Sequence, residues 1–221
     1  MSVKKTVLIT GASRGIGKAI ADRLSRDYVV VTPCRQEMDL SDPDSIKNFF
    51  SNCGYQFDIV INNAGINIIK ATDDVDINDM RLINQVNLQA PLLIAKYATA
   101  YMKANNAGKI VNISSVWGIR SKAQRSLYSS TKSGLIGQTK ALALEFAHHN
   151  ILVNAVCPGF TNTELTAASL NDEQLSNMLA QVPLARMAQP EEIASLVEFL
   201  VSDNNTYITG QAIAIDGGFT V

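Results

Sequence analysis

Residues 6–17 read TVLITGASRGIG, and this stretch decides the fold. The apolar run from Thr6 to Thr10 predicts a short buried strand, and the periodic pattern from Ile16 to Arg26 predicts a helix directly after it. The glycines between them permit positive φ and close backbone approach, while the N–H groups at a helix start attract a pyrophosphate. The stretch therefore predicts a dinucleotide-binding turn, in which we expect cofactor contacts from Gly11, Ser13, Arg14, Gly15, Ile16 and Gly17.

The spacing of the glycines separates this turn from other phosphate-binding motifs. Gly-x3-Gly-x-Gly differs from the commoner G-x-G-x-x-G, so the turn alone is weak evidence. A nucleotide-hydrolysing loop requires G-x4-G-K-[ST], whereas Lys18 is followed here by Ala19. The sequence therefore excludes the hydrolase motif.

Short runs rich in Val and Ile alternate with longer amphipathic stretches along the whole chain, which predicts parallel strands joined by crossover helices. We expect strands over Thr6–Thr10, Val29–Thr32, Met38–Leu40, Ile59–Asn62, Lys109–Ser114, Leu152–Cys157 and Ala212–Ile215. Helices are expected over Ile16–Arg26, Pro43–Ser51, Asn78–Lys103, Tyr128–His149, Asn171–Leu179 and Pro190–Val201. The predicted fold is α/β: a single Rossmann-like NAD(P)-binding domain over residues 1–221, with a doubly wound parallel sheet of about seven strands.

Composition excludes several classes of protein. Of the 221 residues 47% are hydrophobic and 18% charged, with a net charge of -1, which excludes disorder and a bulk nucleic-acid binder. The apolar run after Lys4 and Lys5 is too short for a signal peptide, and no stretch is long enough to span a membrane. Three scattered cysteines indicate reduced, structural thiols, and the adjacent His148 and His149 cannot easily share a metal. We therefore expect a cytoplasmic protein without a metal site.

A second group of residues indicates acid–base chemistry. Tyr128 and Lys132 are four residues apart, so they share one face of a helix. Ser115 follows a central strand close to the start of that helix, and Asn87 lies upstream. A Tyr-x3-Lys pair on its own is most often only a solvated helix face, so the pair needs the wider pattern to carry weight.

With these motifs in place, the chain resembles the short-chain dehydrogenase/reductase family, specifically its single-domain members similar to 3-oxoacyl-acyl-carrier-protein reductase. The resemblance covers essentially all 221 residues, and Ser115 precedes Tyr128 by the 13 positions usual in the family. The motifs that carry it occur in family order: Thr10 to Gly17, Asn62 to Gly65, Asn87, Asn112 to Ser115, Tyr128 to Lys132, Pro158-Gly159, and Ile208 to Gly218.

The resemblance implies a role for each member of a catalytic tetrad. Tyr128 would be the general acid that protonates a carbonyl oxygen as hydride arrives from the nicotinamide. Lys132 would lower the pKa of Tyr128 and hold the nicotinamide ribose. Ser115 would hydrogen-bond the substrate oxygen, and Asn87 would hold a water that links Lys132 to solvent.

The resemblance also implies the remaining cofactor contacts. Asn63, Ala64 and Gly65 would lie against the adenine side, while Thr163 would reach the carboxamide or the phosphates unless it serves only as a helix cap. Further contacts are expected from Arg35, Asp39, Leu40, Tyr128, Lys132, Pro158, Gly159 and Thr161.

The chain departs from the family between Val31 and Leu40, where members normally place a whole helix between strands two and three. The shortened segment should leave the adenosine end of the cofactor less covered. Arg14 and Arg35, with no acid at the end of strand two, favour the 2′-phosphate of NADP(H) over NAD(H), unless both arginines are merely solvated.

Other departures concern the substrate. The positions of the family's carrier-docking arginines correspond to Asn106 and His149, which makes an acyl carrier protein a doubtful partner. Arg120, Lys122 and Arg125 crowd the loop before Tyr128 and could recognise an anionic substrate or simply be solvated. The segment Pro158–Pro183 is a candidate mobile lid.

We therefore expect an NADPH-dependent reductase of a small-molecule carbonyl, either a 3-ketoacyl or a small keto substrate. The alternatives are a sugar or nucleotide-sugar dehydrogenase of the same family and a non-catalytic cofactor-binding scaffold. The apolar ending Ile208–Val221 and the long helices Asn78–Lys103 and Tyr128–His149 resemble the family's tetramer surfaces, so a homotetramer is expected.

Overall fold

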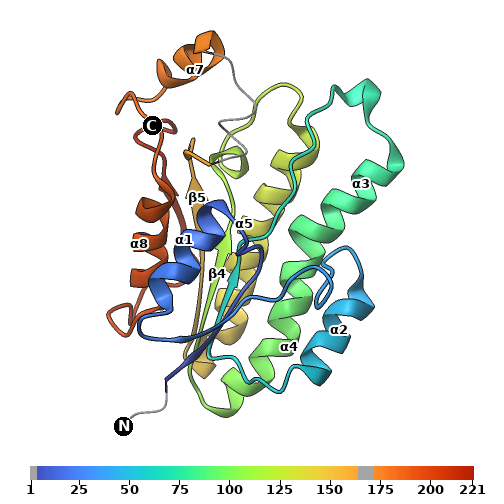
Figure 1. Cartoon of the computed structure of the whole chain (residues 1–221), viewed down its shortest axis with the longest axis vertical. Coiled ribbons are helices and arrows are strands. Elements are labelled where there is room, and N and C mark those ends of the chain that lie inside the picture. The colour runs from blue at the N-terminus through green and yellow to red at the C-terminus, as the bar shows by residue number, and fades with distance from the viewer. Residues whose placement is uncertain (1–3, 164–171) are drawn as a thin grey trace.

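A computed structural model describes residues 4–163 and 172–221. The strands of these residues form one parallel sheet in the order β2-β1-β3-β4-β5-β6 (Figure 1). The strand bounds are β1 Thr6–Ile9, β2 Val29–Val31, β3 Ile59–Asn62, β4 Gly108–Ile113, β5 Ile151–Pro158 and β6 Ala212–Ile215. The predicted Rossmann-like sheet is confirmed, with six strands in the described ranges instead of about seven.

Helices cover both faces of the sheet. The α-helices of the described ranges are α1 Gly15–Leu24, α2 Pro43–Asn52, α3 Ile77–Asn84, α4 Ala90–Ala104, α5 Ser126–Phe146, α7 Asp172–Leu179 and α8 Pro190–Val201. Helices α1 and α8 pack on one face, and α2, α4 and α5 on the other (Figure 1). Successive β1 residues serve both layers: Val7 and Ile9 face α1 and α8, whereas Leu8 faces α2 and α4. Burial on both faces explains why the strands are almost entirely apolar.

The helix starts follow from local sequence. The carboxylate of Asp42 accepts a hydrogen bond from the N–H of Asp44, and Pro43 occupies the first turn of α2. Asp76 caps α3 in the same way. At α8, Gln189 and Glu192 exchange hydrogen bonds in a capping box.

The predicted strand Met38–Leu40 is wrong. The N–H groups of Glu37 and Met38 donate to the carbonyl of Cys34, so the chain forms a turn after β2 instead of a ladder. Met38 is buried, and Leu40 packs against the same core beside α2. The alternating apolar pattern therefore reflects two side chains that anchor a short connection, not a strand face.

The predicted helix Asn78–Lys103 is interrupted. Between α3 and α4 lies a π-helical turn, η2 (Gln85–Gln89), in which the N–H of Ala90 donates to the carbonyl of Gln85. Such a turn bulges the helix and is frequent at functional sites. It carries Asn87, whose side chain is fully buried.

The topology fixes where a ligand can bind. The chain runs from β1 outward to β2 and then returns to β3 on the other side of β1, so the strand order reverses between β1 and β3. Ligands of open α/β sheets bind at the carboxyl ends of the strands at such a reversal. The glycine turn follows β1 there, and Asn63 follows β3.

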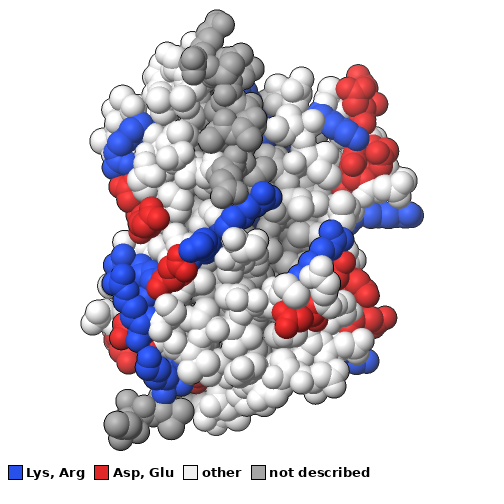
Figure 2. Space-filling view, in the orientation of Figure 1, with Lys and Arg blue, Asp and Glu red and all other residues white. Residues whose placement is uncertain are grey.

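The surface and the cysteines agree with the composition. On the face shown in Figure 2, basic and acidic side chains interleave around a broad uncharged area. Cys34, Cys53 and Cys157 are all free thiols. Within residues 4–163 and 172–221, no helix is long and apolar enough to cross a membrane, and no group of three His, Cys, Asp or Glu side chains could hold a metal.

Candidate active site

The glycine turn is held in shape by the chain itself. Gly15 has a φ of +56°, and a Cβ at Gly17 would lie 2.3 Å from the carbonyl oxygen of Gly11. A side chain is therefore excluded at Gly17, while the left-handed backbone at Gly15 favours glycine. The side-chain amide of Asn63 donates to the carbonyls of Thr10 at 3.0 Å and Gly11 at 2.9 Å, which ties the turn to the end of β3.

Thr10 adds a second tie between these strand ends. Its hydroxyl oxygen accepts the N–H groups of Asn63 at 3.1 Å and Ala64 at 3.0 Å. The sequence indicated an adenine contact for Asn63, but not that its amide braces the turn. The sequence feature that could have indicated this contact is a polar residue after each of two adjacent strands, Thr10 after β1 and Asn63 after β3.

The turn suits a pyrophosphate. Helix α1 begins at Gly15, so its first N–H groups face the turn. Ser13 and Arg14 are exposed beside it, whereas Ile16 packs into the core. A Cβ at Gly15 would lie 3.3 Å from Cγ2 of Thr163, so the segment after β5 reaches the turn.

The segment after β5 is also tied to β6. The N–H of Gly159 donates to the carbonyl of Ile215 at 3.0 Å, and a Cβ at Gly159 would lie 2.7 Å from Cα of Asp216. The hydroxyl of Thr161 donates to the carbonyl of Gly159 at 3.2 Å. Of the two predicted threonines, Thr161 is therefore buried and engaged internally, and Thr163 is the one beside the glycine turn.

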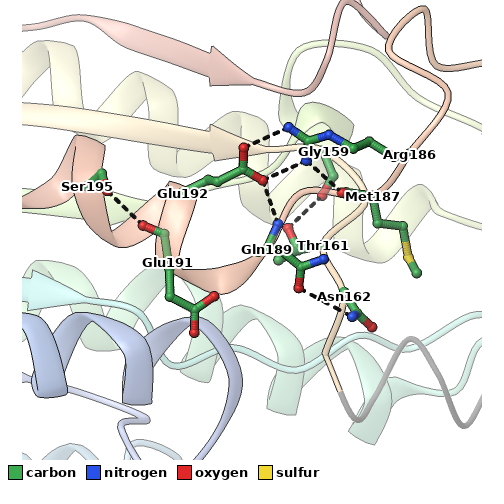
Figure 3. A network of polar contacts seen from close by, with 9 residues as sticks. All are labelled: Gly159, Thr161, Asn162, Arg186, Met187, Gln189, Glu191, Glu192 and Ser195. Carbon is green, nitrogen blue, oxygen red and sulfur yellow. Dashed lines mark hydrogen bonds and ion pairs between the residues drawn. The ribbon is translucent and has the colours of Figure 1, made fainter.

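A polar network joins this segment to the start of α8 (Figure 3). The amide of Asn162 donates to Oε1 of Gln189 at 3.3 Å, and the N–H of Gln189 donates to the carboxylate of Glu192 at 2.8 Å. Arg186 donates to both oxygens of Glu192, at 2.7 and 2.8 Å, and these bonds lower the pKa of Glu192 to about 2. Pro158–Thr163 is thus positioned by contacts on both sides. The predicted lid includes residues 164–171, which lie outside the described residues.

The end of β2 differs from expectation. Arg35 forms an ion pair with Asp39, Nε to Oδ2 at 3.1 Å, so its charge is partly compensated. The carboxylate of Glu37 accepts the N–H of Cys34 at 2.7 Å, which lowers the pKa of Glu37. An acid therefore does lie at the end of β2, although it comes from two residues beyond Arg35.

Ser115 and Tyr128 meet at the carboxyl end of β4. Ser115 is buried and caps the short 3-10 helix η3 (Val116–Gly118), its Oγ accepting the N–H of Trp117 at 3.2 Å. Burial raises the pKa of Tyr128, while a hydrogen bond with Ser115 and the charge of Arg125 act in the lowering direction. The group expected to lower this pKa, Lys132, is not among these causes.

Lys132 is fully buried in α5. Its ammonium donates to the carbonyl of Ile113 at 2.8 Å and lies 5.7 Å from the centre of the Tyr128 ring. Burial lowers the pKa of Lys132 from 10.5 to about 8. A proton can therefore leave or return to this side chain near neutral pH.

Asn87 links the π-helical turn to the segment after β3. Its Oδ1 accepts the N–H of Ile66 at 2.9 Å, and its Nδ2 donates to the carbonyl of Ile66 at 2.8 Å. A Cβ at Gly65 would lie 3.3 Å from Nζ of Lys132 and 3.4 Å from Oδ1 of Asn87. The fold thus brings all four residues of the predicted tetrad to one end of the sheet.

Sequence reasoning missed an aromatic cluster beside this group. The rings of Trp117, Phe160 and Phe219 meet edge to face, with centroids 5.0 to 6.2 Å apart. Arg120 donates to the carbonyl of Phe219 at 3.0 Å and lies over its ring at 4.7 Å. The signal was three aromatic residues that each follow a strand end.

Comparison with known proteins places this geometry in a family. The family model described as enoyl-(acyl carrier protein) reductase matches residues 27–220. The 3-oxoacyl-[acyl-carrier-protein] reductase of Salmonella typhimurium is 38% identical, covering 97% of this chain and 96% of that protein. That alignment spans 239 positions, more than the 221 residues of this chain, so the relative carries residues that this chain lacks.

Solved structures agree. A mutant 4-hydroxyisoleucine dehydrogenase complexed with NADH and succinate has a TM-score of 0.94 at 32% identity, covering 98% of both chains. The structure of ElxO with NADP bound has a TM-score of 0.91 at 29% identity, covering 98% of this chain and 99% of that one. The glycine turn, the strand-end motifs and these relatives together show that this chain belongs to the short-chain dehydrogenase/reductase family and is an NAD(P)-dependent oxidoreductase.

Proposed function

We propose that this protein reduces a carbonyl to an alcohol with NADPH, and that Tyr128 is the general acid. The observation that carries the proposal is that Lys132, buried at the end of β4, holds its ammonium 5.7 Å from the centre of the Tyr128 ring, while Ser115 is buried at the same strand end. Two hydroxyls that converge can bind one carbonyl oxygen. The glycine turn on a nearby strand end would hold the dinucleotide, which supplies the hydride when bound.

The pKa directions fit reduction. Because burial raises the pKa of Tyr128, its phenol stays protonated at neutral pH and can donate to the substrate oxygen. Ser115 donates a second hydrogen bond to that oxygen and stabilises the negative charge that develops there. Lys132, with a pKa of about 8 and its ammonium 5.7 Å from the centre of the Tyr128 ring, can supply the proton that Tyr128 gives up.

NADP(H) is the preferred cofactor in this proposal, with NAD(H) as the alternative. Arg14 and Arg35 supply two exposed cations near the expected 2′-phosphate. Glu37 at the end of β2 favours a ribose hydroxyl instead, as does the pairing of Arg35 with Asp39. The two solved relatives divide in the same way, since one binds NADP and the other NADH.

The substrate is a free small keto compound in preference to a carrier-bound 3-ketoacyl chain. Asn106 and His149 stand where carrier-docking arginines would be expected, and desolvation, followed by the charges of His148 and Lys103, lowers the pKa of His149. His149 therefore adds no charge for an acidic carrier at neutral pH. The succinate in a solved relative is consistent with a small substrate. Oxidation of a sugar or nucleotide sugar is the alternative within the family.

A panel of ketones and alcohols, followed by NADPH absorbance, tests the proposal. Tyr128→Phe should lower kcat at least ~100-fold, because a positioned acid contributes roughly 10²- to 10⁴-fold. Binding of NADPH, measured by its fluorescence, should persist in this variant. Unchanged turnover by Tyr128→Phe would refute the mechanism, and cofactor binding without turnover of any ketone or alcohol would favour the non-catalytic scaffold.

We also propose a homotetramer. Leu144, in the expected contact helix Tyr128–His149, is 82% exposed, and Tyr207, which directly precedes the expected contact segment Ile208–Val221, is 94% exposed. Large apolar side chains that are exposed to water at these places are removed from water when further copies of the chain pack against them.

A further inference from the structure

The three basic side chains of the loop before α5 have different surroundings. Arg120 is committed to the chain end, because its guanidinium donates to the carbonyl of Phe219 and lies over that ring. Lys122 is exposed at the loop surface. Arg125 is half-buried and lies closest to Tyr128 along the chain. The sequence offered all three side chains as candidates for recognising a substrate anion. Their surroundings in the structure leave Arg125 as the candidate.

The guanidinium of Arg125 has an unmet hydrogen-bonding capacity. Its Nη1 is buried, and no residue in the described ranges accepts from it. Its Cζ lies 6.0 Å from the ring centre of Trp117, which supports the group from one side. A buried cationic donor without an acceptor costs free energy, and such groups in native proteins mark a missing ion, water or ligand.

The position of Arg125 relates it to the reacting carbonyl. Arg125 is the N-cap of α5, and Tyr128 lies three residues further along the same helix. The guanidinium of Arg125 lies 6.0 Å from the ring centre of Trp117, and the N–H of Trp117 donates to Oγ of Ser115, so Arg125 borders the group proposed to hold the carbonyl oxygen. Trp117, Phe160 and Phe219 form an apolar wall beside them. A substrate whose carbonyl oxygen is held by Ser115 and Tyr128 can therefore place its next functional group at Arg125.

We propose that Arg125 binds a carboxylate of the substrate, which makes the enzyme selective for keto acids over neutral ketones. This inference rests on the proposed carbonyl reduction at Tyr128. The guanidinium fork matches the two oxygens of a carboxylate, and its low exposure strengthens the pairing. A phosphate dianion would need further cations, whereas Arg120 is engaged and Lys122 is exposed.

The test uses levulinate and its neutral ester, methyl levulinate, which differ only in the anionic group. Wild-type enzyme should have the higher kcat/KM for levulinate. In Arg125→Gln the ratio of kcat/KM for levulinate to that for methyl levulinate should fall roughly 10- to 100-fold, the effect of losing a charged hydrogen bond. Arg125→Lys should restore part of the ratio, and the control Lys122→Gln should leave it unchanged.

Binding can be measured without turnover because Trp117 is the single tryptophan of the chain. Levulinate added to the wild-type enzyme with NADP⁺ should change the Trp117 fluorescence in a saturable way. In Arg125→Gln the half-saturation concentration should rise by a factor similar to the loss in the kinetic ratio.

The outcomes separate this inference from the proposed function. An equal loss for levulinate and methyl levulinate in Arg125→Gln, with a shifted pH profile of kcat, would mean that Arg125 only tunes Tyr128 and would overturn the inference. Wild-type enzyme without preference for levulinate would also overturn it. If no carbonyl is reduced but levulinate still binds in an Arg125-dependent manner, the proposed function fails and the carboxylate site stands.

Discussion

Replacing the buried Lys132 with methionine should stabilise the protein while it removes activity. The side chain is 3% exposed, and burial lowers its pKa from 10.5 to about 8. Each pKa unit corresponds to about 1.4 kcal/mol, so keeping Lys132 charged at pH 7 costs about 3 kcal/mol. Methionine has a similar volume without the charge, but the carbonyl of Ile113 loses its donor, which costs about 1 kcal/mol. The net gain for Lys132→Met is about 2 kcal/mol at pH 7.

This gain should depend on pH in a defined direction. Between pH 8 and pH 10.5 the unfolded chain binds one more proton at Lys132 than the folded chain does, so the stability of the wild type rises with pH. The wild type therefore gains about 2 to 3 kcal/mol by pH 10, and the advantage of Lys132→Met disappears there. Methionine does not titrate, so the variant lacks this gain.

Urea unfolding of the cofactor-free proteins at pH 7 and pH 10, at one fixed protein concentration, measures both effects. At pH 7 the variant should also melt about 4 to 8 °C higher, given the size of the chain. Lys47→Met is the control, because Lys47 is an exposed lysine of α2, outside the proposed subunit contacts, and its loss should change stability by less than about 0.5 kcal/mol. A Lys132→Met protein that is less stable at pH 7, or a stability difference independent of pH, would refute the reasoning.

Three further measurements test other parts of the site. Replacing both Arg14 and Arg35 with alanine should weaken NADPH binding roughly 10- to 100-fold and barely change NADH binding, whereas Glu37→Gln should weaken only NADH, as measured by fluorescence of the bound dinucleotide. Equal losses for both cofactors would contradict this assignment. Gly17→Ala should abolish dinucleotide binding in a calorimetric titration, because its Cβ would lie 2.3 Å from a backbone oxygen; an intact affinity would show that the turn can open. Light scattering should give four times the 23.9 kDa monomer mass, and a monomer mass at micromolar concentration would exclude the tetramer.

The fold could be predicted where the sequence pattern indicates strands that are buried on both faces of the sheet. Strands such as Ile59–Asn62 are buried throughout because helices cover both sides, and the alternation with amphipathic stretches then fixes parallel topology. Met38–Leu40 was mispredicted because two side chains that anchor a short connection to the core, Met38 buried and Leu40 partly buried, have the same spacing as one face of a strand. The π-helical turn at Asn87 could not be predicted, since its hydrogen-bond shift leaves the apolar period of the helix nearly unchanged.

Within the site, only contacts between residues of the same helix or strand could be predicted from their spacing in the sequence. Tyr128 and Lys132 share a helix, so their proximity follows from helix geometry. The bond from Arg120 to Phe219 joins residues 99 positions apart, and nothing local distinguishes Arg120 from Arg125. Their opposite roles depend on how the chain end returns to the sheet, which no periodicity reports.

The short connection after β2 also bears on self-association. With Met38–Leu40 folded into a turn, β2 is the terminal strand of the sheet and its outer edge has no neighbouring strand in the described ranges. An open edge is a template on which other chains can add strands and aggregate. Here the edge has only three residues, Val29–Val31, and Pro33, which lacks an N–H donor, follows almost at once. Because β2 is short and is followed by a proline, its edge offers too few backbone hydrogen-bonding positions for an intermolecular sheet to grow.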